Sequence, residues 1–534
     1  MQPPDAKRIF PCVDRMEERT RQLQNDPVAA SQVDNRAPVG HHSFVHDRPF
    51  LCDYGGWLPQ GFRLAYETWG TLNAGQTNAI LIHTGLSANS HARSHAANPA
   101  PGWWERFIGP GQAIDTDKFF VVCTNVLGSC YGSTGPSSRD PVTTRRYATT
   151  FPILTIHDMV RAQFHLLDHL GIYRLHASVG ASMGGMQSLA AAVMYPDRVG
   201  RLVTISACAR SHPYSIALRH VQRQVLMSDP HWRKGHYYHD DDGGIPPHAG
   251  MKLAREIATI SYRSGPEWGK RFGRKRLDPA AAASTAGGGG KPPTSLAADD
   301  HRLPEFCPDF LIESYLDHQG EKFCLQYDPN SLLYISKAMD LFDLSGPALR
   351  SLLDHRHRNL AQHADDGPAL RAEEAAAYPG IPRSPLVTGP SPSASQASQP
   401  PTPTDAAPAR TLLDTSSPSS SPACHLSAHH YHHHRTDAEP HGNIDQLEDA
   451  YGDELNLIEG LRAIQIPTLV LGVKSDILFP VWQQQEIAQA LRRGGNQRVT
   501  YYELDSIYGH DTFLLDLTNT GAAVKGHLEN LVIV

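Results

Sequence analysis

The sequence predicts an α/β fold in which helices cover both faces of a largely parallel β-sheet. Two patterns indicate it: short, almost continuously apolar segments of strand length, and longer segments between them with apolar residues at helical spacing. Thr155–Leu170 is the clearest expected helix. Short buried strands that alternate with helices pack as a sheet between two helical layers. The expected strands are Phe62–Trp69, Ala79–His83, Phe119–Thr124, Leu175–Val179, Arg201–Ser206, Thr468–Val473 and Val499–Leu504.

Changes of composition along the 534 residues predict five regions within one interrupted domain. Residues 1–45 are polar and irregular, and we expect a loose arm there. Residues 46–207 form the first part of the core. Residues 208–344 are rich in His, Tyr, Arg and helix formers, and we expect a helical cap. Residues 345–441 consist mostly of Pro, Ser, Ala and His, which predicts a disordered insert. Residues 442–534 restore the pattern of the core.

The bulk composition argues against several classes of protein. The formal net charge is −7, from 48 basic and 55 acidic residues, so no basic field favours nucleic acid or an anionic membrane. No apolar run approaches the length of a membrane span. The first thirty residues lack the apolar core of a signal peptide, so we expect a cytoplasmic location. The eight cysteines are scattered without a C-x-x-C pair, which favours reduced thiols and no metal site.

Gly180-Ala-Ser-Met-Gly184 forms the pattern G-x-S-x-G between an expected strand and the helix-compatible segment 186–194. In α/β-hydrolases this setting holds a serine exposed above the sheet, with glycines where side chains would collide. The pattern alone is weak, and a plain glycine turn is the alternative. Its flanking segments and the partners described next favour Ser182 as a nucleophile.

A serine hydroxyl needs a base in order to attack, and the base needs an acid to orient it. In α/β-hydrolases these residues follow in the order Ser, Asp or Glu, His. Asp476 comes just after the sixth expected strand, and His510 just after the seventh. Because loops that follow parallel strands gather at one edge of the sheet, we predict the triad Ser182, Asp476 and His510. Asp505 is the alternative acid, and ordinary loop roles are the alternatives for Asp476 and His510.

The oxyanion formed during acyl transfer needs backbone N–H donors that are already oriented. Met183, which follows the nucleophile, is the first expected donor. Gly85 or Leu86, in the loop after an early strand, is the second. His83 in the same segment is interpreted as a structural hydrogen-bonding residue in preference to a second base.

Five longer strings are more specific than the motif: SMGGMQSLA, HTGLSANSHA, NVLGSCYGSTGPSS, VQRQVLMSDP and GHDTFLL. They resemble the homoserine O-acetyltransferase family, and within it the fungal members described as serine O-acyltransferases. The resemblance covers about residues 50–344 and 466–515, which is most of the expected ordered chain. A generic esterase would share only the G-x-S-x-G pattern and a Gly-His pair near the end.

This resemblance implies a ping-pong acyltransferase of cysteine or methionine biosynthesis, with acyl-CoA as co-substrate and no further cofactor. Ser182 would take an acetyl or succinyl group from acetyl-CoA or succinyl-CoA, and the hydroxyl of L-serine or L-homoserine would then attack, with His510 as base. On the family's pattern, Arg255 and Asp511 bind the amino acid. A guanidinium can hold an α-carboxylate, and a carboxylate an α-ammonium. A cap salt bridge and a loop cap are the alternative roles.

One loop departs from the family's pattern. Its usual H-A-L-T-G is replaced by His83-Thr-Gly-Leu-Ser87, with a continuation through His91, Arg93 and His95 that we interpret as a partner for a succinyl carboxylate. The departure favours serine over homoserine as the acceptor. The basic run 270–276 is interpreted as the end of a cap helix, with contact to CoA phosphates as the alternative.

Other functions remain open at this point. They are a homoserine O-acetyltransferase proper, a carboxylesterase of the same fold and a non-catalytic binding protein. The oligomeric state is open between a monomer and a homodimer. The predicted triad argues against the binding protein, and the expected amino-acid-binding pair Arg255 and Asp511 argues against a simple esterase.

Overall fold

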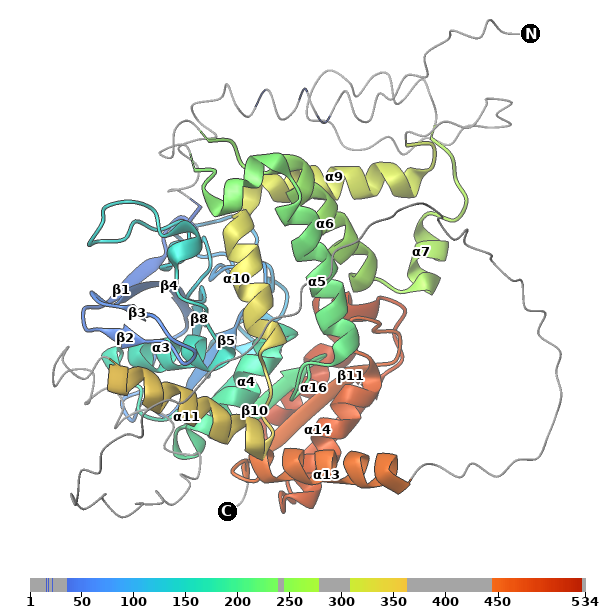
Figure 1. Cartoon of the computed structure of the whole chain (residues 1–534). Helices are drawn as coiled ribbons and strands as arrows, with labels where there is room; N and C mark the ends of the chain where they lie inside the picture. Colours follow the sequence, from blue (N-terminus) through green and yellow to red (C-terminus); the bar gives the residue numbers. More distant parts are fainter. Residues whose placement is uncertain are drawn as a thin grey trace, which may run out of the picture. The chain divides into compact units, whose positions relative to one another are not determined.

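The computed structural model confirms the predicted α/β-hydrolase architecture, which is built on an eight-stranded sheet (Figure 1). Its order is β1-β4-β8-β5-β9-β10-β11-β12. Neighbours from β8 to β12 are parallel, whereas β4 is antiparallel to both β1 and β8. The structure describes residues 36–238, 244–277, 308–362 and 444–530 and three isolated positions before them. The strands are β1 His42–His46, β4 Phe62–Trp69, β5 Ala79–His83, β8 Phe120–Thr124, β9 Ala177–Ala181, β10 Leu202–Ile205, β11 Thr468–Val473 and β12 Val499–Leu504.

Two small sheets lie outside this one. Strands β2 (Phe50–Leu51) and β3 (Trp57–Leu58) pair antiparallel, and β6 (Ile108–Gly109) and β7 (Ile114–Asp115) pair parallel. Every strand expected from the sequence occurs, with ends shifted by at most two residues. The main sheet is therefore the one that the apolar runs predicted.

Alternate residues of the central strands enter two separate cores, because successive side chains of a strand point to opposite faces. On one face, Leu81 of β5 and Val470 of β11 pack with helices α3, α4 and α14. On the other face, Ile80 and Leu469 pack with α16. The sheet is thus covered on both sides, as a parallel sheet requires. These helices are α3 Ile156–His169, α4 Met183–Met194, α14 Val481–Arg493 and α16 Leu517–Glu529.

Helix α3 begins at a capping box. The Thr155 hydroxyl accepts the Asp158 N–H at 2.9 Å, and the Asp158 carboxylate accepts the Thr155 N–H at 2.9 Å. This reciprocal pair satisfies donors that a helix N-terminus otherwise leaves free. It explains why the helix predicted over residues 155–170 begins where it does.

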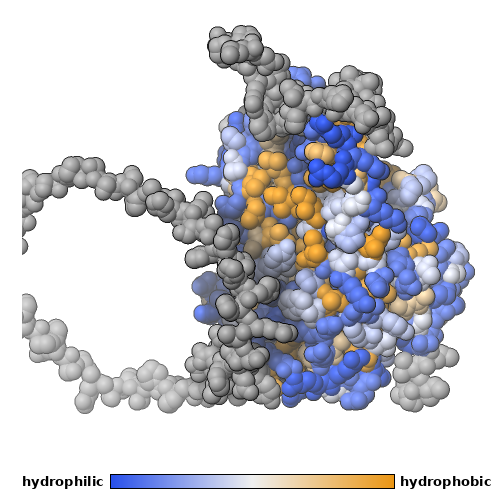
Figure 2. All heavy atoms as spheres, turned by 90° about the vertical axis from the view of Figure 1, so that its right-hand side faces the viewer, coloured by the Kyte–Doolittle hydropathy of each residue, from blue (hydrophilic) through white to orange (hydrophobic). Residues whose placement is uncertain are grey.

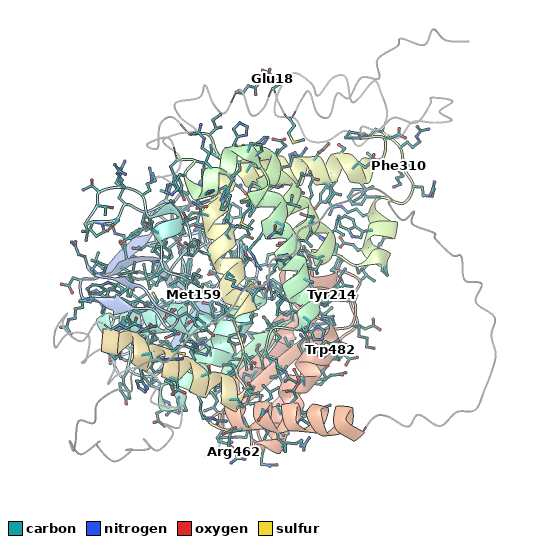
Figure 3. The ribbon with its side chains drawn as sticks, viewed as in Figure 1. Glu18, Met159, Tyr214, Phe310, Arg462 and Trp482 are labelled. Carbon is teal, nitrogen blue, oxygen red and sulfur yellow. The ribbon has the colours of Figure 1, made fainter. Side chains whose placement is uncertain are left out.

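The region 208–344 is helical where it is described, as predicted for a cap. In Figure 1 its green and yellow helices group together, with α6 packed against α5 and α9. The Ser215 hydroxyl donates to the Leu478 carbonyl at 3.2 Å, and His212 lies edge-on to Trp482 at 4.8 Å. Figure 3 labels Tyr214 and Trp482 on the two elements that meet there. The cap helices are α5 Pro213–Met227, α6 His248–Tyr262, α7 Gly265–Arg271, α9 Leu311–Gln326 and α10 Pro329–Asp340.

The cap also exposes apolar side chains. Tyr214 and Val221 on α5, and Leu253 and Ile260 on α6, are between 42% and 50% exposed. Each pair is seven residues apart, which places both members on one side of their helix. Figure 2 shows one face of the molecule, on which hydrophobic residues gather in a patch among hydrophilic ones.

Two predicted boundaries were wrong. The arm over residues 1–45 ends earlier, because His42–His46 forms β1 against β4. Only Phe44 of these five residues is buried, so the segment has no apolar run to reveal a strand. The insert over 345–441 begins later, because Gly346–Gln362 forms helix α11. Its mean hydropathy is low, and the buried Arg356 secures it by donating to the Leu51 carbonyl at 3.1 Å.

The core segments before and after the insert belong together. One compact unit comprises Met1–Arg383 and Gly452–Val534, and the other comprises Ser384–Tyr451. Helix α13 (Ile444–Leu461) begins the described part after the insert. Residues 363–443, including the His-rich run 428–434, lie outside the described residues. Within the described part of the chain, no helix is both long enough and apolar enough to cross a membrane.

Candidate active site

Ser182 occupies a sharp turn between β9 and α4. Its backbone has φ 58° and ψ −129°, a conformation that side-chain-bearing residues rarely adopt. The Ser182 N–H donates to the Ile205 carbonyl of the neighbouring strand at 2.9 Å. Strain of this kind persists where the surrounding structure enforces it, often at functional sites. The half-buried serine therefore stands at the carboxyl edge of the central strand, as the motif predicted.

The two outer glycines of the motif allow this turn to close. A Cβ on Gly180 would lie 2.0 Å from the Gly184 carbonyl oxygen. A Cβ on Gly184 would lie 2.2 Å from the His83 carbonyl oxygen at the end of β5. Both positions exclude any larger residue, because these backbone atoms cannot move aside.

Asp476 and His510 meet at the same edge of the sheet. Asp476 follows β11 and His510 follows β12, and the His510 Nδ1 lies 2.7 Å from Asp476 Oδ2. The other Asp476 oxygen accepts the N–H groups of Leu478 and Phe479 at 2.9 Å each. The carboxylate is thus held in place from both sides. Asp505, the alternative acid, is 88% exposed and faces Lys474 instead.

The surroundings of His510 set its basicity. Burial alone would lower the pKa of His510, but the charge and hydrogen bond of Asp476 outweigh it and raise the pKa above its ordinary value. Phe479 stacks on the imidazole ring with centroids 5.3 Å apart. The arrangement holds Nδ1–H on the carboxylate and leaves Nε2 to exchange a proton, as in a serine-nucleophile triad.

The predicted oxyanion donors lie on the two elements that flank the nucleophile. Met183 is the first residue of α4, where a backbone N–H has no partner within the helix. Gly85 and Leu86 belong to residues 84–88, here named the oxyanion loop, which follow β5; in β5, His83 pairs with Gly180 of β9. Both loop residues are half-buried.

His83 is not a second base in this structure. Its Nε2 lies 2.8 Å from the Ser178 hydroxyl, and the ring is buried between strands. Burial lowers the pKa of His83 to about 3, so the ring stays neutral at physiological pH and cannot take up a proton there. This agrees with the structural role expected from the sequence.

Arg255 and Asp511 both face the region of His510, but they do not pair with each other. Arg255 stacks over Phe323 at 4.5 Å and over Tyr262 at 5.2 Å, and its buried Nε has no hydrogen-bond partner. Burial raises the pKa of Asp511, and the positive charges of Arg263, His510 and Arg255 partly oppose this rise. Among the described residues, no carboxylate forms an ion pair with Arg255, whose Nη1 donates to the Tyr262 hydroxyl at 3.4 Å.

Arg263 is a residue that the sequence reasoning missed. Its Nε lies 3.0 Å from the Asp511 carboxylate, and it also pairs with Glu267. Arg263 directly follows α6 and has an extended backbone, so helical spacing from Arg255 does not set its direction. No local pattern in the sequence points to its position beside Asp511.

The basic run 270–276 ends helix α7 and forms the turn after it, as expected for a cap helix end. Arg271 stacks over Tyr315 at 4.4 Å. Arg276 pairs with Asp309 at 2.8 Å. These contacts account for two of its charges within the cap itself.

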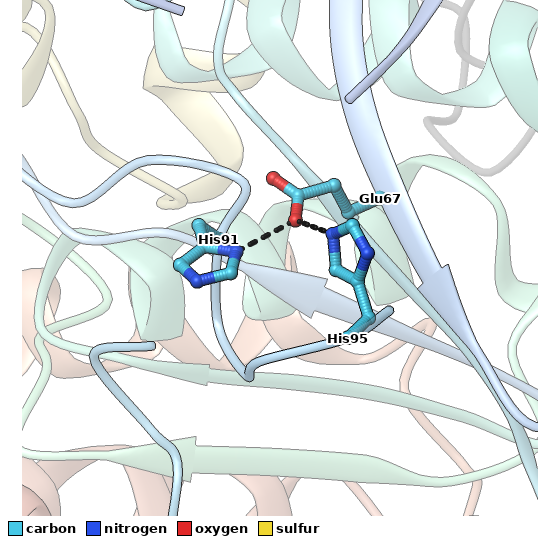
Figure 4. Close-up of side chains that lie close together, drawn as sticks. All are labelled: Glu67, His91 and His95. Atoms are coloured by element: carbon cyan, nitrogen blue, oxygen red, sulfur yellow. Dashed lines mark hydrogen bonds and ion pairs between the residues drawn. The ribbon is translucent and has the colours of Figure 1, made fainter. Parts of the chain in front are cut away.

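A buried polar cluster anchors the segment after the oxyanion loop to β4 (Figure 4). The Glu67 carboxylate of β4 lies 2.8 Å from both His91 Nδ1 and His95 Nε2. It also accepts a hydrogen bond from the Ser90 hydroxyl at 2.8 Å. His91 Nε2 also lies 2.7 Å from the Ala100 carbonyl oxygen. Both nitrogens of His91 thus lie within hydrogen-bonding distance of an oxygen atom.

The cluster changes the interpretation of the His-rich continuation. His91 and His95 are engaged with Glu67, and Arg93 donates to the carbonyls of Ile108 and Glu105. The expectation that they receive a succinyl carboxylate is therefore not supported. The three side chains of the cluster also bring possible metal-ligand atoms within 4.8 Å of one another. The hydrogen bonds among these side chains account for this geometry, and the absence of a bound metal stays a prediction.

Replacing Glu67 with glutamine is expected to destabilise the fold. The side chains of Glu67 and His91 are 2% and 8% exposed, and losing a partner of a buried hydrogen bond costs about 1–3 kcal/mol. Urea unfolding measures this loss. Glu503→Gln, the same change on the exposed part of β12, should alter the free energy of unfolding by less than about 0.5 kcal/mol. Equal effects of the two substitutions, or a loss of wild-type stability in EDTA, would contradict a metal-free, hydrogen-bonded cluster.

The fold and the site define the class of the protein first. It has an α/β-hydrolase fold, and a family model described as alpha/beta hydrolase fold matches residues 78–307. Among solved structures, esterase E22 superposes with a TM-score of 0.61 at 22% identity, covering 92% of this chain and 100% of that one. The homoserine O-acetyltransferase from Bacillus anthracis gives 0.61 at 22% identity, covering 93% and 99%. At these identities the likeness shows the fold.

Sequence relatives narrow the class. The serine O-succinyltransferase of Emericella nidulans is 50% identical over 97% of this chain and 87% of its own length. The serine O-succinyltransferase of Schizosaccharomyces pombe is 48% identical over 97% of this chain and 94% of its own length. The chain belongs to this serine O-succinyltransferase family of O-acyltransferases, which confirms the resemblance seen in the sequence.

Proposed function

We propose that the protein transfers an acyl group from acyl-CoA to the hydroxyl of L-serine, or of L-homoserine, through an acyl-enzyme on Ser182. Succinyl-CoA is the proposed first donor, because the relatives are named serine O-succinyltransferases. The product would be an O-acylated amino acid for cysteine or methionine biosynthesis. An esterase of the same fold is the rival function.

The observation that carries the proposal is the position of Arg255. No described carboxylate pairs with this cation, and its charge acts on Asp511, the residue after His510, which also pairs with Arg263. An amino-acid acceptor has a carboxylate for the guanidinium and an ammonium for Asp511. Water, the acceptor of an esterase, needs neither group.

The proposed reaction uses the strained turn at Ser182 and the pair of His510 with Asp476. Ser182 Oγ attacks the thioester carbonyl while His510 Nε2 takes its proton, and the N–H groups of Met183 and the oxyanion loop stabilise the oxyanion. The C–S bond breaks, and His510 returns the proton to the CoA thiolate. The acceptor hydroxyl then gives its proton to His510 and attacks the acyl-enzyme. The Ser182 C–O bond breaks, and His510 reprotonates the serine.

Release of the CoA thiol in the presence of each acceptor tests this function. Comparing kcat/KM for acetyl-CoA and succinyl-CoA with L-serine and L-homoserine separates the choices. Serine and homoserine differ by one methylene, which a pocket discriminates by about 1–3 kcal/mol. We expect L-serine to be at least as good an acceptor as L-homoserine. A preference of more than about a hundredfold for homoserine with acetyl-CoA would indicate a homoserine O-acetyltransferase proper, and release unaffected by either amino acid would indicate an esterase.

Replacing Arg255 with methionine is expected to raise KM for the amino acid by about ten- to a hundredfold, since a charged hydrogen bond contributes about 1.5–3 kcal/mol. Acylation of Ser182 should persist. Arg271→Met is the matched control, because Arg271 also stacks on an aromatic ring of the cap but lies on α7. If both variants changed KM alike, or if Arg255→Met left it unchanged, the assigned role of Arg255 would be wrong.

A further inference from the structure

Tyr327 joins the cap to the oxyanion loop. It follows the last residue of α9, and its ring is fully buried. The Tyr327 hydroxyl donates to the Leu86 carbonyl oxygen at 2.7 Å. A residue 241 positions away in the sequence therefore holds the backbone next to the predicted second oxyanion donor.

The bond completes a set that fixes consecutive peptide groups of the loop. The Thr84 carbonyl accepts from Gln187 Nε2 at 2.9 Å, and the Gly85 carbonyl accepts an N–H three residues later at 3.3 Å. In a planar trans peptide, the N–H points opposite to the preceding carbonyl, so each bond also aims one N–H. Tyr327 holds the peptide after Leu86, and the backbone dihedrals of Leu86 are then fixed on both sides.

The Thr84 hydroxyl donates to the Thr124 carbonyl at 3.3 Å and Leu86 packs against the core, but Gly85 between them has no side chain to hold it. A Cβ on Gly85 would meet no atom within 4 Å, so packing does not restrict this residue. Glycine also has the widest choice of backbone conformations. Hydrogen bonds from side chains outside the loop must therefore set the direction of the donors at Gly85 and Leu86.

The direction of the Tyr327 hydroxyl is itself fixed by aromatic packing. Phe323, one turn earlier, stacks on the ring with centroids 5.2 Å apart and 11° between the planes. Tyr131 meets the ring edge-on at 5.6 Å. The Arg255 guanidinium also stacks on Phe323, with its carbon 4.5 Å from the ring centroid. Arg255, which is proposed to bind the acceptor, and Tyr327, which holds the oxyanion loop, thus both pack on Phe323.

We propose that Tyr327 is a positioning residue for acyl transfer, which holds the oxyanion loop in the shape that stabilises the oxyanion. It does not touch the reacting atoms and acts through the Leu86 peptide. This inference rests on the proposed function for its natural donor, but the effect on Ser182 acylation does not depend on which acceptor the enzyme uses.

Tyr327→Phe removes one oxygen atom and keeps the ring and its stacking. Acylation of Ser182 by p-nitrophenyl acetate can be monitored as a burst of p-nitrophenol. This assay needs neither acyl-CoA nor an amino acid. We expect the acylation rate constant to fall by roughly three- to tenfold, the value of one ordinary hydrogen bond. The ester concentration for half-saturation should stay unchanged. Tyr334→Phe is the matched control, since its hydroxyl donates to the Thr149 carbonyl at 3.0 Å, elsewhere in the cap.

The outcomes are distinguishable. A slower burst in Tyr327→Phe supports the inference if the Tm and the half-saturating ester concentration equal those of Tyr334→Phe. This holds even if serine proves not to be the acceptor. A wild-type burst in Tyr327→Phe overturns it and leaves the proposed function intact. Parallel losses of rate and Tm in both variants also overturn it, because the effect would then come from general destabilisation.

Discussion

Ser182→Ala is expected to abolish acyl transfer, with a loss in kcat of about a million-fold, as for other serine nucleophiles. The hydroxyl is the atom that forms the acyl-enzyme, and no described neighbour can replace it in this turn. Mass spectrometry after mixing with succinyl-CoA should show the added acyl mass on the wild type and none on the variant. Ser228→Ala, which removes the exposed hydroxyl at the end of α5, should keep both acylation and turnover.

The strained backbone adds a second test of the same residue. Ser182 has a positive φ that glycine adopts freely. Ser182→Gly should therefore be inactive but about 1 kcal/mol more stable than Ser182→Ala in urea unfolding. Acylation that persisted in both variants would refute a covalent mechanism on this serine.

Asp476→Asn is expected to lower kcat by about ten-thousandfold while the fold remains intact. An amide cannot accept the Nδ1–H of His510 with the strength of a carboxylate, and the ring loses its orientation and its countercharge. Asp505→Asn is the matched control, because this exposed acid follows β12 and faces Lys474. A large loss in Asp505→Asn with little in Asp476→Asn would exchange the roles of the two acids.

The pH dependence of kcat/KM tests in which direction Asp476 shifts the pKa of His510. The neutral form of His510 acts as base, so kcat/KM falls as the pH drops through its pKa. Asp476 raises that pKa, after burial has lowered it. Removing the carboxylate therefore lowers the pKa, and the acid limb of the residual activity should move to lower pH. A move to higher pH would mean that Asp476 does not stabilise the protonated ring.

Much of the site could be predicted because its signals are local. Each central strand is a short apolar run, and such a run must be covered on both faces. Ser182 directly follows β9, and Asp476 and His510 lie in the loops after β11 and β12, so the parallel sheet places them at one edge. The predicted triad needed only the order of the elements and the residue that follows each of them.

Contacts between distant segments were decided only by the tertiary structure. Strand β1 has a single buried residue, and its pairing with β4 makes it a strand. Glu67 meets His91 and His95 across two elements, although it reads as an ordinary polar residue of a strand. Tyr327 reaches the oxyanion loop from the cap.

The physical reason is the range of the forces that act. Hydrophobic periodicity and turn chemistry depend on residues a few positions apart, and the sequence alone determined the sheet and the order of the triad residues. The partner of a buried charge or hydroxyl depends on which groups the packed chain brings within about 3 Å of it. Only the folded structure could therefore show that Asp511 pairs with Arg263 and that Arg255 stacks on Phe323 and Tyr262.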